Sequence, residues 1–115
     1  MQYMLLAYAD QMTFIKMAPE EQKQALGAYQ AFMEALKKAN AYQSSGRLQP
    51  ISTATTVRVT NGKTQVLNGP YMETKEQLGG YFLIDVADLD AALSWAARCP
   101  ASTHGTVEVR PMWVM

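Results

Sequence analysis

Two charged side chains beside a turn are the first candidates for chemistry in this sequence. Glu73 and Lys75 lie two residues apart in a polar segment. A carboxylate in such a place can act as a general base, and a neighbouring cation can hold an anionic substrate. The same pair would also suit a solvated or ion-paired turn that begins a short helix. Glu73 is therefore a candidate catalytic base and Lys75 a candidate substrate ligand, with the structural alternative left open.

Two arginines are candidate ligands for an anion. Arg58 and Arg110 both lie on expected strands, on the face opposite their valine neighbours. Guanidinium groups bind carboxylate or phosphate in a forked geometry. The alternative is pairing with Glu108, Glu73 or Asp85 at a dimer interface. We favour the structural role for Arg110 and keep both roles open for Arg58.

Three tyrosines and the single histidine complete the set of candidates. The phenol groups of Tyr29, Tyr71 and Tyr81 can each donate a hydrogen bond to an enolate-like oxygen. Tyr29 lies on an apolar helix stripe, where core packing with a satisfied hydroxyl is the common alternative. His104, the only histidine, can act as an acid or base near neutral pH or can simply be solvated. It has no second ligand at a recognisable metal spacing, so we expect no metal site.

The composition limits where and on what the protein acts. The chain has 115 residues, which fits a single domain over 1–115. Ten basic and ten acidic side chains cancel, so no electrostatic footprint for nucleic acid or for an anionic membrane is present. The lone cysteine, Cys99, and eight methionines favour a reducing cytoplasm, and no apolar run approaches the roughly 20 residues of a membrane-spanning helix.

The first half of the chain predicts a strand, a loop and a long helix. Residues 2–8 are almost continuously apolar, as in a central strand covered on both faces. The connection 10–18 is unusually apolar and is expected to pack down, or to cover a pocket or a partner. Proline and two glutamates at 19–21 begin a helix that we extend to about Ala41. Ser44-Ser45-Gly46 is interpreted as a break.

The second half predicts a hairpin, another strand, a helix and a last strand. Asn61-Gly62 is the strongest hairpin signal, because a type I′ turn needs positive φ at both central residues. It joins strands 53–60 and 63–68 and pairs Val57 with Val66. A buried strand follows over 81–86. Asp88 caps a helix with a stripe of Leu89, Ala92, Leu93 and Ala96, and residues 106–110 form the last strand before the apolar tail 112–115.

The order of these elements predicts an α+β, ferredoxin-like (βαββ-βαβ) sandwich with two helices on one face of the sheet. The expected strands are apolar on both sides, so the second face must also be covered. A homodimer that stacks or extends the sheets, a dimeric α/β-barrel type of assembly, is the simplest cover.

Several stretches resemble the YCII-related family, in the branch named for its Asp-Gly-Pro-Phe motif. The central block is Asn68-Gly69-Pro70-Tyr71 with the residues up to Tyr81, supported by stretches 3–6, 53–58 and 107–111. The resemblance covers nearly the whole chain. It implies a dimeric ferredoxin-like fold related to small cofactor-free isomerases and dehalogenases, of bacterial type. Some members occur beside or fused to extracytoplasmic-function sigma factors.

The sequence departs from the family pattern in two places. The motif here has an amide, Asn68, in place of the leading carboxylate, and Tyr71 in place of phenylalanine. The wider family is associated with a His–Asp pair, whose positions align near Tyr29 and Cys99 in this chain. The resemblance therefore does not transfer that proton-transfer dyad.

Together these interpretations predict a cytoplasmic, small-molecule-binding homodimer that needs no cofactor. Its chemistry would be isomerase-like or lyase-like, on a small organic anion, at a site between the sheet and the first helix. Glu73 and Tyr71 are the expected catalytic residues, and Arg58, Lys75, Tyr81 and Tyr29 the expected substrate ligands. The alternative is a non-catalytic interaction module, such as a sigma-factor partner, that would use an exposed patch of Met12, Phe14, Ile15 and Trp113.

Overall fold

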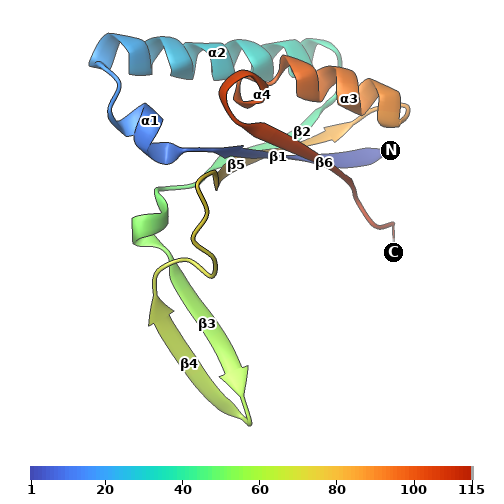
Figure 1. Ribbon diagram of the computed structural model, residues 1–115. Helices are drawn as coiled ribbons and strands as arrows, with labels where there is room; N and C mark the ends of the chain where they lie inside the picture. Colours follow the sequence, from blue (N-terminus) through green and yellow to red (C-terminus); the bar gives the residue numbers. More distant parts are fainter. Residues whose placement is uncertain (115) are drawn as a thin grey trace.

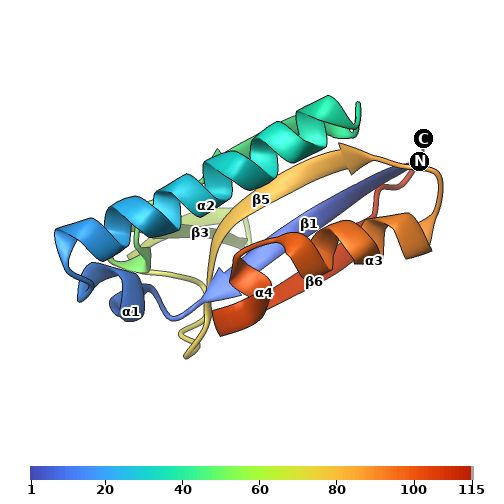
Figure 2. The same cartoon turned by 90° about the horizontal axis from the view of Figure 1, so that it is seen from above.

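The computed structural model describes residues 1–114 and shows helices layered on one face of a sheet (Figure 1). The sheet has four antiparallel strands in the order β2-β5-β1-β6, which are Tyr42–Arg47, Gln77–Asp85, Gln2–Ala9 and Thr106–Pro111. Helices α2 (Pro19–Lys38) and α3 (Leu89–Arg98) lie side by side over this sheet (Figure 2). The predicted ferredoxin-like α+β fold is confirmed.

Alternation along the central strand decides what the helices bury. Tyr3, Leu5 and Ala7 of β1 are buried beneath the helices, whereas Met4 and Leu6 between them face the opposite side and are only half-buried. Side chains of β5, α2 and α3 complete the core, and they include Phe82, Ile84, Phe32, Leu36, Ala92 and Ala96. The face without helices is called the open face below.

We expected the apolar connection 10–18 to be a loop, but part of it is helical. It contains the short helix α1 (Gln11–Ile15), which begins after Asp10 because the Asp10 carboxylate accepts a hydrogen bond from the Met12 N–H at 3.0 Å. A second short helix, α4 (Ala101–His104), replaces part of the loop expected around His104. Both short helices pack at the same end of the sheet as the first turns of α2 (Figure 2).

The interpretation of Ser44-Ser45-Gly46 as a break is wrong, because these residues belong to the edge strand β2. An edge strand needs no alternating apolar pattern, since its backbone hydrogen bonds to β5 hold it in place. Gly46 is suited to its position because a Cβ there would lie 2.7 Å from the ring of Tyr81. Strand β5 also begins earlier than expected, at Gln77 rather than Tyr81.

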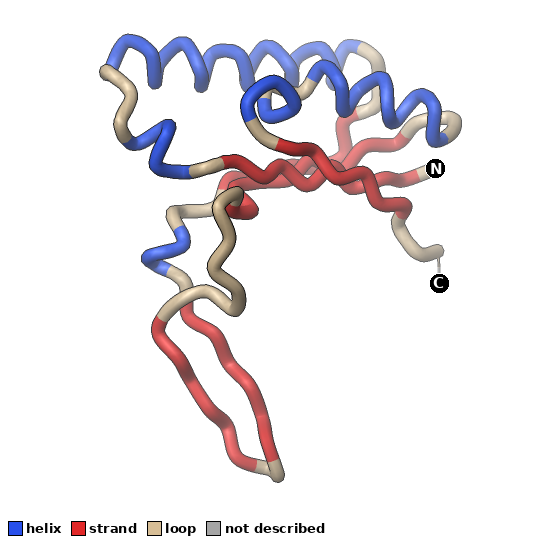
Figure 3. The backbone as a smooth tube through the Cα atoms, viewed as in Figure 1, coloured by secondary structure: helices blue, strands red, loops and turns tan. Residues whose placement is uncertain are grey.

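The predicted hairpin is confirmed, but it lies outside the main sheet. Strands β3 (Thr55–Thr60) and β4 (Lys63–Asn68) form a separate two-stranded sheet in which Val57 pairs with Val66. Asn61 (φ 52°) and Gly62 (φ 74°) form the turn. This hairpin, called the arm below, projects from the open-face side (Figures 1 and 3). The 3₁₀ turn η1 (Ile51–Thr53) precedes it, and β3 begins at Thr55 rather than at Thr53 as predicted.

The end of helix α2 and the buried face of helix α3 also differ from the predictions. Helix α2 ends at Lys38 rather than near Ala41, because Asn40 adopts a left-handed conformation (φ 56°). Leu89 and Leu93 of α3 are about half exposed, since its alanine row and Trp95 face the core instead. Met115 of the apolar tail lies outside the described residues. Within residues 1–114, no helix is long and apolar enough to cross a membrane.

Candidate functional site

Small residues on the helix-covered face of the sheet leave an open space beneath α2. Arg47 of β2 pairs with Gly80 of β5, which in turn pairs with Ala7 of β1. In the next row toward the core, Ser45, Phe82 and Leu5 fill the interior instead. Because Gly80 and Ala7 have almost no side chain, a cavity of about 420 Å³ remains above them, between the sheet and helices α1, α2 and α4.

Most of the cavity wall is apolar. Phe14 and Ile15 come from α1, while Leu26 and Met33 come from the α2 face that looks down on the sheet. Residues 10–18 carry many apolar side chains because this segment covers the cavity. Of the alternatives that the apolar composition left open for this segment, the structure shows the one in which it lines a pocket.

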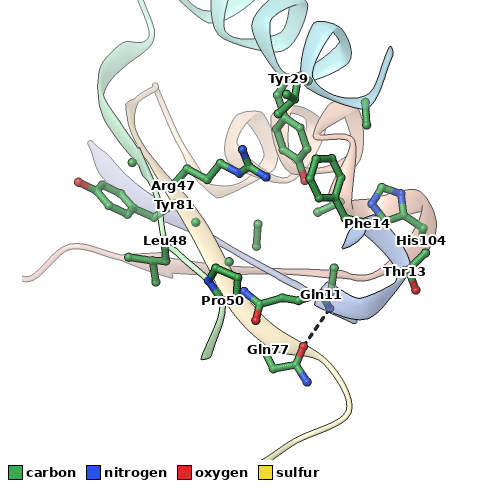
Figure 4. A pocket seen from close by; sticks show the side chains of 18 of the residues that line it. Gln11, Thr13, Phe14, Tyr29, Arg47, Leu48, Pro50, Gln77, Tyr81 and His104 are labelled. Carbon is green, nitrogen blue, oxygen red and sulfur yellow. Dashed lines mark hydrogen bonds between the residues drawn. The ribbon is translucent and has the colours of Figure 1, made fainter. Parts of the chain in front are cut away.

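Two polar side chains converge inside this wall. The Arg47 guanidinium lies over the Phe14 ring, 4.9 Å from its centroid, and extends toward Tyr29 (Figure 4). The Tyr29 ring stacks parallel to Phe82, with centroids 6.4 Å apart. Within the described part of the chain, neither the Tyr29 hydroxyl nor the Arg47 guanidinium has a hydrogen bond or ion-pair partner. Both groups are therefore available to a ligand.

Burial makes the Tyr29 phenol harder to ionise than an ordinary tyrosine. Loss of solvent raises the pKa of Tyr29 to about 12; nearby Cys99 adds to the rise, and Arg47 opposes it. Burial likewise raises the pKa of the Cys99 thiol. At neutral pH Tyr29 is therefore a hydrogen-bond donor and Cys99 an unreactive thiol.

This shift predicts how stability changes in alkali. The folded-state pKa of Tyr29, about 12, exceeds the unfolded value of 10.0, so the unfolded chain loses this proton first. The free energy of unfolding should therefore fall as pH rises from about 10 to about 12, and stay unaffected by Tyr29 below that range. Denaturant unfolding across this range should show a smaller fall for Tyr29→Phe than for the wild type. Equal falls in the two proteins would contradict the assignment, and exposed Tyr71→Phe is the control.

His104 is the third polar group at the cavity. It ends α4 and lines the cavity rim, where Figure 4 shows it near Phe14 and Thr13. Its Nδ1 lies 3.3 Å from the Thr103 hydroxyl, which leaves Nε2 without a hydrogen-bond partner among residues 1–114. His104 is thus an acid or base within reach of a bound ligand.

Two glutamines connect the cavity wall to the base of the arm. The Gln11 backbone N–H donates to Gln77 Oε1 at 3.0 Å (Figure 4), and Gln11 Oε1 accepts from the Ile51 N–H at 3.0 Å. Gln77 Nε2 donates to the Thr74 carbonyl oxygen at 2.6 Å. The segment that enters the arm and the segment that leaves it are therefore both tied to side chains that line the cavity.

The structure brings two of the predicted site residues to the cavity. Tyr29 points into it, and Tyr81 lies at its edge with its ring over Gly46, away from Arg47 (Figure 4). Tyr81 faces the other side because β5 alternates and Phe82 occupies the helix side.

The other four predicted residues lie with the arm. Arg58 sits over the exposed Tyr71 ring, 5.7 Å from its centroid, and Glu73 and Lys75 are exposed in the following loop. None of the four lines the cavity of the same chain. The arm projects on the side of the sheet away from α2 (Figure 1), so a single chain does not unite these residues with Tyr29. Their catalytic and binding roles stay predictions.

Sequence reasoning missed Arg47. It lies in the segment interpreted as a break, so no strand pairing was assigned to it. Its position opposite Gly80 became visible only once β2 was placed beside β5. The cluster of apolar residues in 10–18 was the one signal that pointed to this place.

Met12, Phe14, Ile15 and Trp113, which we expected to form one patch for a protein partner, do not lie on a single surface. Phe14 and Ile15 line the cavity on α1, whereas Trp113 is 90% exposed in the C-terminal tail after β6, and this tail lies at the end of the sheet away from α1 (Figure 1). These residues therefore give no support to the interaction-module alternative.

The fold and the site together define a ferredoxin-like α+β protein with a cavity between its helices and its sheet. The chain belongs to the YCII-related domain family, whose model matches residues 1–115. An uncharacterized protein of Rhizobium meliloti (strain 1021) is 37% identical over 115 residues, which covers 97% of this chain and 92% of that protein. The finer placement in the Asp-Gly-Pro-Phe branch stays a prediction.

A solved structure confirms the fold at low sequence similarity. It is 5-chloro-2-hydroxyhydroquinone dehydrochlorinase from Burkholderia phenoliruptrix AC1100, in complex with 2,5-dihydroxybenzoquinone. The TM-score is 0.56 with 14% identity, over 98% of this chain and 94% of that one. At this identity the likeness establishes the shared fold. Within residues 1–114, no group of three or more His, Cys, Asp or Glu side chains is placed to hold a metal ion.

Proposed function

We propose that this protein binds a small planar organic anion in the cavity and catalyses an isomerase-like or lyase-like reaction without a cofactor. The observation that carries the proposal is the unpaired Arg47 guanidinium beside the neutral Tyr29 phenol, in an apolar cavity of about 420 Å³. Apolar walls with a few convergent polar groups are typical of small-molecule sites. Arg47 selects an anion, and the Phe14 and Tyr29 rings favour a flat ligand.

The similar solved structure supports this class of ligand. Its name describes loss of chloride from a hydroxylated ring, and it was solved with a planar dihydroxyquinone. Elimination of this kind needs a base and a stabilised oxyanion. The cavity residues of this chain supply both.

The proposed reaction uses one proton transfer. His104 takes a proton from a carbon beside a carbonyl group, and the electron pair moves onto the carbonyl oxygen to form an enolate. The Tyr29 hydroxyl and the Arg47 guanidinium stabilise that oxygen. In a lyase the electron pair then returns and expels an anionic group from the adjacent carbon. In an isomerase the proton returns from His104 to a different carbon.

A ligand screen tests the binding part of the proposal. Benzoate, salicylate and 2,5-dihydroxybenzoquinone are each added in a thermal-shift assay, with neutral benzamide as the matched control for benzoate. Ligand at about 100 times Kd stabilises the folded state by about 2.7 kcal/mol, which raises Tm measurably. We expect the anions to raise Tm and benzamide to leave it unchanged. Equal shifts for benzoate and benzamide, or none for any anion, would reject the proposed anion site.

Two substitutions distinguish the competing bases. Once a substrate is found, His104→Gln should lower kcat by about a hundredfold, because general-base catalysis typically contributes 10²–10⁴-fold. Glu73→Gln should leave kcat within about twofold of the wild type if Glu73 stays away from the cavity. If a second copy brings Glu73 to the site, Glu73→Gln should instead lower kcat by about a hundredfold, as His104→Gln does. Steady-state kinetics of both variants decide which base acts. An unchanged rate in His104→Gln would remove His104 from the proposed mechanism.

We also propose that the protein acts as a homodimer and that it works in the cytoplasm. Met4, Leu6 and Leu83 form an apolar open face that has no covering layer in the described chain. The cytoplasmic location is supported by the single buried thiol and the eight methionines, which suit a reducing compartment.

A further inference from the structure

The cavity is larger than a single aromatic ring requires. In another protein an apolar cavity of about 150 Å³ is enough to bind benzene, whereas this cavity has about 420 Å³. Volumes of about 300–1,000 Å³ are typical of sites for drug-sized ligands, which combine a ring with further groups. A ligand of one ring would therefore leave most of the cavity to water or to a substituent.

The charges in the cavity limit what that substituent can be. Among the described residues that line the cavity, Arg47 is the only lysine or arginine, and its guanidinium extends toward Tyr29 (Figure 4). Asp10 also lines the cavity, and its carboxylate would repel a second negative charge. The group that fills the remaining space is therefore expected to be uncharged.

Apolar side chains continue from the cavity to the protein surface. Ile15 of α1 and Leu26 of α2 both line the cavity, yet they are 49% and 39% exposed. A side chain that contacts both the cavity and the solvent lies at the opening. Single exposed leucines are common on protein surfaces, but these two side chains border the same cavity as the unpaired guanidinium. An apolar group of the ligand would remove them from water.

Leu26 lies one helical turn before Tyr29. Residues three apart on a helix are neighbours on the same face, so Leu26 follows Tyr29 along the cavity toward the start of α2. One turn covers about 5.4 Å, a distance that a chain of about four carbon atoms can span. A ligand held by Arg47 and Tyr29 can therefore place such a chain against Leu26 while its ring stays in the cavity.

We propose that the ligand is a monoanionic aromatic acid with one apolar substituent of several carbon atoms, which points to the opening and packs on Ile15 and Leu26. This inference rests on the proposed anion site and specifies the class of ligand that the site takes. The acid group binds Arg47 and Tyr29 and determines the orientation, because the opening offers no second cation among the described lining residues. The substituent adds affinity by leaving water.

Two acids of equal charge test the substituent. 4-Methylbenzoate and 4-butylbenzoate differ by three methylene groups, and each group that becomes fully buried contributes about 0.8 kcal/mol, or about fourfold in affinity. Because the side chains at the opening are about half exposed, we expect about half of this free energy, which is about twofold for each group. 4-Butylbenzoate should therefore bind about eightfold more tightly than 4-methylbenzoate in isothermal titration calorimetry.

A pair of leucine substitutions tests where the substituent lies. Leu26→Gln makes the opening polar, and Leu93→Gln makes the same change on α3, where the side chain is 47% exposed and lies away from the cavity. We expect the ratio of the two affinities to fall to about twofold or less in Leu26→Gln and to stay at about eightfold in Leu93→Gln. Both side chains are exposed, so unchanged circular dichroism is the expected check on folding.

The outcomes separate the ligand class from the anion site. If 4-methylbenzoate binds and 4-butylbenzoate binds no more tightly, Ile15 and Leu26 contact something other than the ligand. That result would overturn the inference and leave the anion site in place. A gain that persists in Leu26→Gln would put the substituent elsewhere and would also overturn it. If neither acid binds, the inference and the anion site both fail.

Discussion

Replacing Arg47 by glutamine is expected to weaken benzoate binding by about ten- to a hundredfold. A hydrogen bond to a charged group contributes about 1.5–3 kcal/mol, which corresponds to that range of affinity. Arg47 is exposed on an edge strand, and it has no ion-pair partner in the described chain, so its removal should leave the fold unchanged. Isothermal titration calorimetry of the wild type and Arg47→Gln measures the difference directly.

Arg58→Gln is the matched control for this experiment. Arg58 is the arginine that sequence reasoning selected as a ligand, and the structure places it over Tyr71 on the arm. We expect benzoate affinity in Arg58→Gln to stay within about twofold of the wild type. The reverse outcome, in which Arg58→Gln loses binding and Arg47→Gln keeps it, would move the site from the cavity to the arm.

Replacing Gly105 by alanine is expected to lower the free energy of unfolding by about 3 kcal/mol. Gly105 joins α4 to β6, and a Cβ at this position would overlap the Tyr8 carbonyl oxygen and crowd Ala9. Both contacts are on the central strand β1, so the backbone must shift, and crowding of this kind costs about 1–3 kcal/mol or more. Urea unfolding of the wild type and the variant measures the loss. His104 precedes the glycine, so the shift should also displace it from the cavity rim.

Gly27→Ala is the control for the glycine substitution. A Cβ on Gly27 meets nothing within 4 Å on the exposed side of α2. Because alanine favours a helix over glycine, this variant should be more stable than the wild type by about 0.5–1 kcal/mol. If Gly105→Ala had the same free energy of unfolding as Gly27→Ala, Gly105 could not lie as close to β1 as described.

The sequence predicted the elements whose formation depends on local chemistry. Asn61-Gly62 set the hairpin and its register, because few other residues adopt positive φ at two successive positions. The apolar stretch around Leu5 marked the central strand, and Asp88 marked the start of α3, where its carboxylate accepts from the Ala91 N–H at 2.9 Å. Their order indicated the right fold class, although the main sheet contains β2, which was interpreted as a break, and not the two hairpin strands.

The site could not be predicted in the same way, because it depends on contacts between distant segments. The cavity forms because strand pairing places Gly80 beside Arg47 and Ala7 beside Gly80. No local sequence pattern indicates which strands will pair in this way. The polar edge strand β2 has neither alternation nor β-branched residues, so it was read as a break. Glu73 and Lys75 looked promising by spacing alone, and the position of the arm, a tertiary feature, separated them from Tyr29.

The burial of Cys99 makes site-specific labelling of this protein possible. The sulfhydryl is 1% exposed and is the chain's sole cysteine, so maleimide dyes should react very slowly with the native protein. A cysteine introduced in place of Thr60, beside the hairpin turn, would then be the only site that takes a fluorophore. Donor-labelled and acceptor-labelled molecules could be mixed, and energy transfer between them would report how far apart two such turns lie in solution.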